Sequence, residues 1–162
     1  MFARQSALGL ALLLALIVST ARADDRLSDM EPLIGSWACK TRTAEIESHF
    51  RWMIDGAFIE HDHVLHMFGR ANRVKEVIGW DAASQSIRGW IFSDEGVSIC
   101  TYVRDGDDWQ VDLHLTRNDG TEDRKQKTLT IGDGRLIVRN EKAPLPEFLQ
   151  LEFMRADGEP EE

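Results

Sequence analysis

The sequence contains no complete catalytic motif of the common kinds. It has no Gly-x-Ser-x-Gly segment that would present a nucleophilic serine, no glycine-rich loop that would cradle a phosphate, and no dinucleotide-binding fingerprint. The chain therefore lacks the sequence signatures of serine hydrolases, P-loop nucleotidases and dinucleotide-dependent oxidoreductases. The sequence favours a binding protein over an enzyme.

Basic residues are scarce relative to acidic ones. The chain carries 19 Lys and Arg against 28 Asp and Glu, for a net charge of −9 at pH 7. Nucleic acids and anionic membranes bind proteins largely through clustered positive charge. This balance argues against both kinds of partner, and we expect the partner to be a small-molecule ligand.

The only long hydrophobic run lies at the N-terminus. The basic Arg4, the apolar run Leu8–Val18 and the small-residue ending Ala21-Arg22-Ala23 predict a secretory signal peptide over residues 1–23. The run is too short for a typical membrane span, and an uncleaved anchor is the alternative. We expect an exported protein, periplasmic or extracellular, with no membrane association after cleavage.

Only two cysteines are present, Cys39 and Cys100. Disulfides form readily in exported proteins, so the two could pair. The alternation of side chains argues against pairing. Cys39 shares a strand face with Trp37, which we expect to point inward, whereas Cys100 lies on the face opposite Val97 and Ile99, which we also expect to point inward.

Long helical patterns are absent beyond a short apolar periodicity over residues 26–34. Ten short strands separated by Asp-, Asn- and Gly-rich turns are predicted near residues 35–42, 46–54, 57–66, 73–80, 87–93, 97–104, 109–116, 122–131, 135–140 and 148–155. An open sheet of this size would leave two exposed edges. We therefore predict an all-β fold, a closed antiparallel meander barrel over residues 24–156, with a short N-terminal helix covering one end and a disordered acidic tail over residues 157–162.

The most informative segment is residues 48–66, where alternating polarity flanks Asp55-Gly56. A two-residue turn at this dipeptide predicts a hairpin in which Ile54 faces Ala57 and each earlier residue faces the corresponding later one. One face is mostly apolar, so we expect it to point inward. That face holds Ser48, Phe50, Trp52, Ile54, Ala57, Ile59, His61 and His63.

Several segments resemble a known family. Gly35-Ser36-Trp37 is similar to the G-x-W element that opens the first strand of lipocalin-like (calycin) barrels. Further segments resemble a bacterial family of exported lipocalin-like barrels of unknown function: WMIDGAFIE (52–60), VIGWD (77–81), IRGWIFSDEG (87–96) and RDGDDW (104–109). The resemblance implies a barrel that binds small apolar molecules, with Arg155 stacked on Trp37. More distantly, the chain resembles nitrobindin-like barrels, which bind haem.

Two histidines on the inward face suggest a site. His61 and His63 leave one face of a strand, and Glu76 shares parity with inward residues of the next strand, so the three could bind zinc or iron. Alternatively, the histidines hydrogen-bond inside the lumen, one of them ligates haem, or His61 and Glu76 form an acid–base pair.

The main prediction is a ligand site in the lumen for an apolar or partly aromatic molecule. The chain has five tryptophans, and inward aromatic side chains either fill a barrel or line its cavity. The residues expected to contact the ligand are Phe50, Trp52, Ile59, His61, His63 and Trp80.

Overall fold

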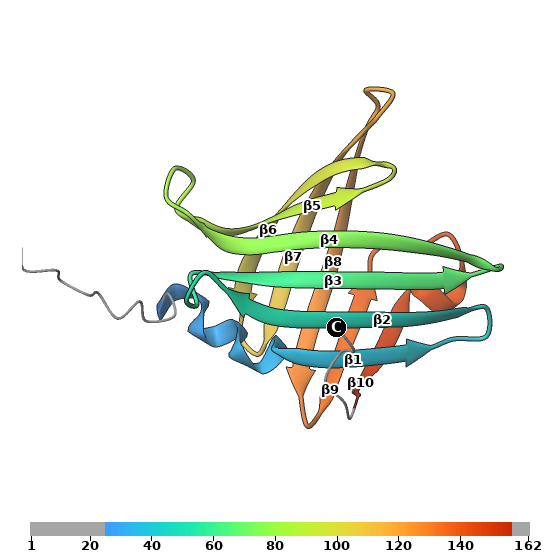
Figure 1. Cartoon of the computed structure of the whole chain (residues 1–162), viewed down its shortest axis with the longest axis horizontal. Coiled ribbons are helices and arrows are strands. Elements are labelled where there is room, and N and C mark those ends of the chain that lie inside the picture. The colour runs from blue at the N-terminus through green and yellow to red at the C-terminus, as the bar shows by residue number, and fades with distance from the viewer. Residues whose placement is uncertain (1–24, 157–162) are drawn as a thin grey trace, which may run out of the picture.

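The computed structural model describes residues 25–156. They form the predicted closed ten-stranded antiparallel barrel, in which each strand pairs with its sequence neighbours and the last strand pairs with the first (Figure 1). The predicted signal peptide (1–23) and acidic tail (157–162) lie outside the described residues. The strands are β1 (Gly35–Lys40), β2 (Ala44–Met53), β3 (Phe58–Met67), β4 (Arg70–Asp81), β5 (Ser86–Ser93), β6 (Gly96–Asp105), β7 (Asp108–Arg117), β8 (Glu122–Gly132), β9 (Arg135–Asn140) and β10 (Gln150–Arg155).

A short helix covers one end of the barrel, as predicted. It is a 3-10 helix, η1 (Asp25–Leu33), and it buries Leu27, Met30 and Leu33. Proline at position 32 has no N–H to donate, which limits continuation of the helix. No helix among residues 25–156 has the length and apolar character needed to cross a bilayer.

Two side chains satisfy the carbonyl groups at the end of this helix, which have no partner within it. The Trp37 indole N–H donates to the Leu33 carbonyl at 2.7 Å. The Arg155 guanidinium donates to the carbonyls of Ile34 at 2.8 Å and Pro32 at 3.0 Å. The same guanidinium lies 4.4 Å from the centre of the Trp37 ring, so the expected cation–π contact is present.

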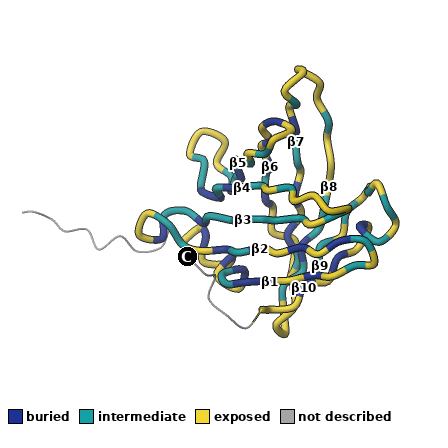
Figure 2. The backbone as a smooth tube through the Cα atoms, turned by 45° about the vertical axis from the view of Figure 1, so that its right-hand side comes forward, coloured by how far each residue is buried: buried dark blue, intermediate teal, exposed yellow. Residues whose placement is uncertain are grey.

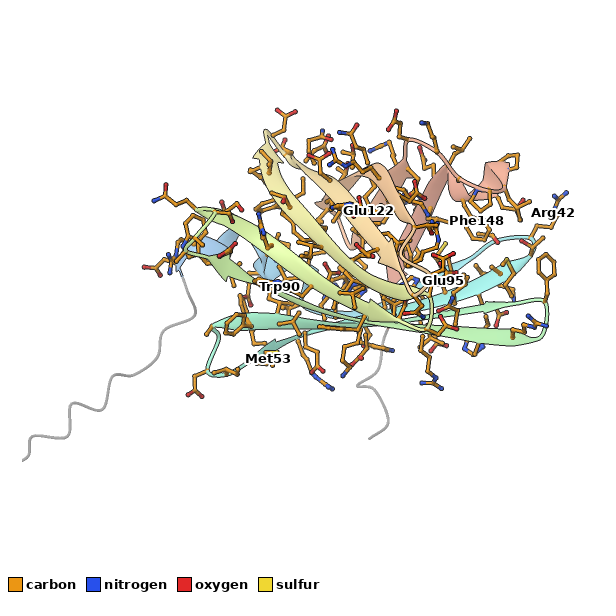
Figure 3. All side chains as sticks on the ribbon, turned by 90° about the horizontal axis from the view of Figure 1, so that it is seen from above. Arg42, Met53, Trp90, Glu95, Glu122 and Phe148 are labelled. Carbon is orange, nitrogen blue, oxygen red and sulfur yellow. The ribbon has the colours of Figure 1, made fainter. Side chains whose placement is uncertain are left out.

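The other end of the barrel is partly closed by a second 3-10 helix, η2 (Pro146–Phe148), which buries Phe148. The Thr43 hydroxyl donates to Glu147 at 2.5 Å, and Arg42 lies 3.5 Å from the same carboxylate. Figure 3 shows Arg42 and Phe148 at this end, far from Met53 at the end of β2. The interior therefore has a cover at each end.

The predicted hairpin register is confirmed from Met53↔Phe58 to Ser48↔His63. The turn is different, because Ile54 to Ala57 form a four-residue loop in which Ile54 and Asp55 both have positive φ. Ile54, expected inside, is 63% exposed. A β-branched residue in the left-handed region is sterically costly. The apolar side chain of Ile54 therefore did not predict that this residue lies in the turn and is exposed.

The predicted faces of β6 are wrong. Val97 and Ile99 point outward and are 47% and 40% exposed, whereas Cys100 is fully buried. Apolar side chains occupy both faces of this strand, so the alternation of polarity does not show which face points inward. Cys39 and Cys100 are both free and buried. They lie on β1 and β6, which are five strands apart in either direction around the barrel.

The wall of the barrel is uneven in length. The β7–β8 hairpin extends beyond the other strands, and its tip is exposed (Figures 1 and 2). The β8–β9 ladder ends at Lys127↔Asn140, so residues 122–126 of β8 have no partner on β9. The wall beside β8 is therefore not closed by a strand along its whole length.

Candidate functional site

The interior of the barrel contains a partly open cavity of about 220 Å³. One part of its surface is apolar and comes from the helix and from β8 to β10: Leu33, Leu129, Leu136, Val138, Leu151 and Phe153. The other part carries Phe50 and a group of polar side chains: Ser48, His61, His63, Glu76, Tyr102, Lys127 and Asn140. The cavity thus has an apolar side and a hydrogen-bonding side.

Strand register places His61 at the centre of the polar side. His61 on β3 lies directly opposite Glu76 on β4 and Phe50 on β2. Directly opposed side chains in antiparallel strands are close enough to interact. His61 Nδ1 is 3.0 Å from Glu76 Oε2, and its ring stacks on Phe50 with the ring centres 3.9 Å apart and the planes at 10°. The imidazole is therefore fixed on two sides.

Glu76 accepts two further hydrogen bonds. Tyr102 Oη donates to Glu76 Oε1 at 2.7 Å, and Cys100 Sγ donates to the same oxygen at 3.1 Å. Gly89 makes room for this arrangement, because a Cβ atom there would lie 2.0 Å from Glu76 Oε1 and 2.6 Å from Cys100 Sγ. The buried carboxylate thus has three donors, which is what a buried charge requires.

These contacts determine the protonation states of the buried polar side chains around the cavity. Burial would raise the pKa of Glu76, but the hydrogen bond and charge of His61, with Lys127 and Tyr102, outweigh it and lower the pKa to about 2. Burial, followed by repulsion from His61 and Lys127, lowers the pKa of His63 to about 3. Burial and the charge of Glu76 raise the pKa values of Cys100 and Tyr102. At neutral pH, Glu76 is a carboxylate, and His63, Cys100 and Tyr102 are neutral.

The second nitrogen of His61 is free to act on a ligand. Nε2 is buried and has no hydrogen-bond partner among residues 25–156. Because Nδ1 faces the Glu76 carboxylate, Nε2 is the ring nitrogen of His61 that can hydrogen-bond a molecule in the cavity.

The structure brings together four of the predicted site residues and leaves three outside. Phe50, His61, His63 and Glu76 line the cavity. Trp52, Ile59 and Trp80 do not: Ile59 is fully buried in the core, Trp52 donates to Glu31 on η1 at 2.8 Å, and the Trp80 ring lies 4.7 Å from the Arg26 guanidinium. The two tryptophans hold the helix over the barrel end.

Sequence reasoning missed the other side of the cavity. Tyr102 and Lys127 line it, and so does Asn140. A signal was present, because Lys127 shares parity with Leu129 on a predicted strand and therefore points to the same face. The pairing of β8 with β9 and of β9 with β10 then adds Leu136, Val138 and Leu151.

The predicted metal ligands His61, His63 and Glu76 do not form a three-ligand group in the part of the chain that the structure describes. His63 Nδ1 lies 2.9 Å from the Ser48 hydroxyl and His61 Nδ1 lies 3.0 Å from Glu76 Oε2, so the Nδ1 atom of each ring already has a partner. No group of three or more His, Cys, Asp or Glu side chains within residues 25–156 is placed to hold a metal ion. Haem is a large planar ligand, and 220 Å³ is below the roughly 300–1,000 Å³ typical of pockets for drug-sized molecules.

Fold and site together define the chain as a closed antiparallel β-barrel with an internal cavity. No known protein family model matches the chain, and no curated protein matches it.

Proposed function

We propose that the barrel binds a small, apolar or partly aromatic molecule in its lumen. The observation that carries this proposal is the cavity of about 220 Å³ between an apolar surface and an ordered polar cluster. A cavity of about 150 Å³ lined by apolar side chains is enough to bind benzene. The lumen therefore has room for a single ring with a short substituent, or for a short alkyl chain with a polar end.

The two parts of the cavity have different roles in this proposal. Transfer of apolar ligand surface from water contributes about 25 cal/mol per Å² buried, and Leu136, Val138 and Phe153 supply the contact. A few placed polar groups orient a ligand in an otherwise apolar pocket. His61 is such a group, because Phe50 and Glu76 hold its ring in place before any ligand arrives.

Filling the cavity tests the proposal. Val138 lines the lumen on β9, and its neighbour Ile137 has the opposite parity on the same strand. We expect isothermal titration calorimetry to detect toluene and hexanamide binding to the wild type and to Ile137→Trp, and at least tenfold weaker binding to Val138→Trp. Equal binding by Val138→Trp and the wild type would overturn the proposal, provided that thermal unfolding shows both variants folded.

We also propose export to the periplasm or the extracellular space. The basic, apolar and small-residue order of residues 1–23 supports it. The resemblance to exported lipocalin-like barrels supports both export and ligand binding. Mass spectrometry of the protein from a bacterial periplasmic fraction tests export: an N-terminus at Asp24 is expected, and an intact chain retained in the cytoplasm would contradict it.

A further inference from the structure

The polar end of the lumen adjoins the outside of the barrel where β8 and β9 part. Lys127 and Asn140 form the last pair of that ladder. Both line the lumen cavity, and both also line a hollow of about 290 Å³ whose border includes Arg139 and the carboxylate-bearing Glu141. This point in the wall is therefore shared by the interior and an outside surface.

Lys127 brings a positive charge to this point. It has the inward parity of Leu129 and is half-buried. Within residues 25–156 its ammonium group makes no hydrogen bond and has no carboxylate within 4.0 Å. A partly buried cation without a hydrogen-bonding partner is unfavourable.

The groups around Lys127 do not neutralise it by direct contact. The carboxylate of Glu76 has its three donors in His61, Tyr102 and Cys100. The Asn140 side-chain N–H donates to the Phe148 carbonyl at 2.7 Å. Lys127 and Glu76 attract each other at longer range, and a ligand anion at this position would add a directly hydrogen-bonded partner for the ammonium group.

We propose that the natural ligand is a small monocarboxylate, with its carboxylate paired to Lys127 and its apolar part between Leu129, Val138 and Leu151. This inference rests on the proposed lumen function and specifies its ligand class. The lumen volume limits the apolar part to a short alkyl chain or one ring. Charge-assisted hydrogen bonds are stronger than neutral ones, so the carboxylate would determine selectivity.

Hexanoate and hexanamide test the inference, because they have nearly the same shape and differ in charge. We expect calorimetry on the purified protein at pH 7.5 to give hexanoate a Kd at least tenfold lower than hexanamide. Lys127→Met should remove this preference, and Lys127→Arg should keep it. Lys125→Met is the matched control, since Lys125 lies on the same strand face and pairs with Asp123 at 3.9 Å; it should leave the preference unchanged.

The outcomes separate the two proposals. If wild type binds hexanamide as tightly as hexanoate, or if the preference survives in a folded Lys127→Met protein, the carboxylate assignment is overturned and lumen binding stands. If both ligands bind Val138→Trp as tightly as the wild type, binding is outside the lumen and both proposals fail. If hexanoate does not bind the wild type at all, the carboxylate assignment is wrong, and the binding of toluene and hexanamide still tests the lumen function.

Discussion

His61 Nδ1 lies 3.0 Å from Glu76 Oε2, and the two residues are directly opposite each other on β3 and β4. Both side chains line the cavity, and the other nitrogen of the same ring is buried without a partner among the described residues. The pair gives the lumen a fixed orientation of its polar groups, so substitutions in and around it should change both stability and binding.

Replacing Glu76 by Gln should destabilise the protein by roughly 1–3 kcal/mol. The change leaves the buried donors of Tyr102, Cys100 and His61 with a neutral partner, and a buried donor that loses a charged acceptor carries a cost of this size. Urea unfolding measures it. Glu60→Gln is the control: Glu60 is held by Arg51 and Lys75 on the outer face, where exposed ion pairs are worth about 0–1 kcal/mol. Equal losses of stability in both variants would show that the hydrogen bonds to Glu76 are worth no more than an exposed ion pair.

Stability should fall as the solution becomes acidic, in two overlapping ranges. The pKa of His63 is lowered from 6.5 to about 3, so the unfolded chain takes up a proton there before the folded protein does, and stability is lost as pH falls from 6.5 to 3. The pKa of Glu76 is lowered from 4.5 to about 2, so its contribution is complete above pH 4.5 and is lost below it.

Each proton contributes a slope of at most about 1.4 kcal/mol per pH unit. Urea unfolding at a series of pH values measures the slope. His63→Gln should remove the decline between pH 6.5 and 4.5, and His66→Gln, an exposed histidine on the same strand, should leave it in place. A stability that stays constant from pH 7 to pH 4.5 in the wild type would show that His63 is not buried in neutral form.

Gly89→Ala should be strongly destabilising for a change of one methyl group. The added Cβ would lie 2.0 Å from Glu76 Oε1, and overpacking of this kind costs about 1–3 kcal/mol. Gly132→Ala is the matched control, since a Cβ at that strand position meets nothing within 4 Å. Thermal unfolding measures the stability of the two variants. A Gly89→Ala protein as stable as Gly132→Ala would show that the side chains around Glu76 are not closely packed against Gly89.

Arg155→Ala should loosen the helix-covered end of the barrel. It removes the cation–π contact with Trp37 and two hydrogen bonds to the carbonyls of Pro32 and Ile34, for an expected loss of about 2 kcal/mol. Hydrogen exchange over η1 should become faster. Arg135→Ala removes only an exposed ion pair with Glu152 and should have little effect. Unchanged exchange over η1 in Arg155→Ala would show that Arg155 does not hold the helix.

The strand pattern and the central hairpin could be predicted from local chemistry. Alternation on both sides of Asp55-Gly56 determines which residues of β2 and β3 share the inward face, so the sequence alone predicts that His61 and Phe50 lie opposite each other. The faces of β6 could not be predicted in this way, because Val97 and Ile99 are as apolar as the residues that point inward. Packing of Cys100 and Tyr102 against Gly89 and Glu76 determines which face of β6 points inward.

The cavity itself depends on residues far apart in sequence. Its apolar surface comes from β8 to β10, whereas its polar surface comes mainly from β2, β3, β4 and β6. Whether inward side chains fill a barrel or leave space depends on the sum of their volumes across all strands, which no local pattern contains. Trp52 and Trp80 show the same limit: alternation predicts their inward parity but not their contact with η1.

The most direct test of ligand binding in the lumen is an NMR measurement of contacts between hexanamide and methyl groups of the protein. Binding in the lumen predicts intermolecular nuclear Overhauser effects to the methyl groups of Leu136, Val138 and Leu151, and none to Ile137. Contacts confined to the exposed Val97, Ile99 and Val103 on the outer face would contradict it, and would place the ligand on the outside of the barrel.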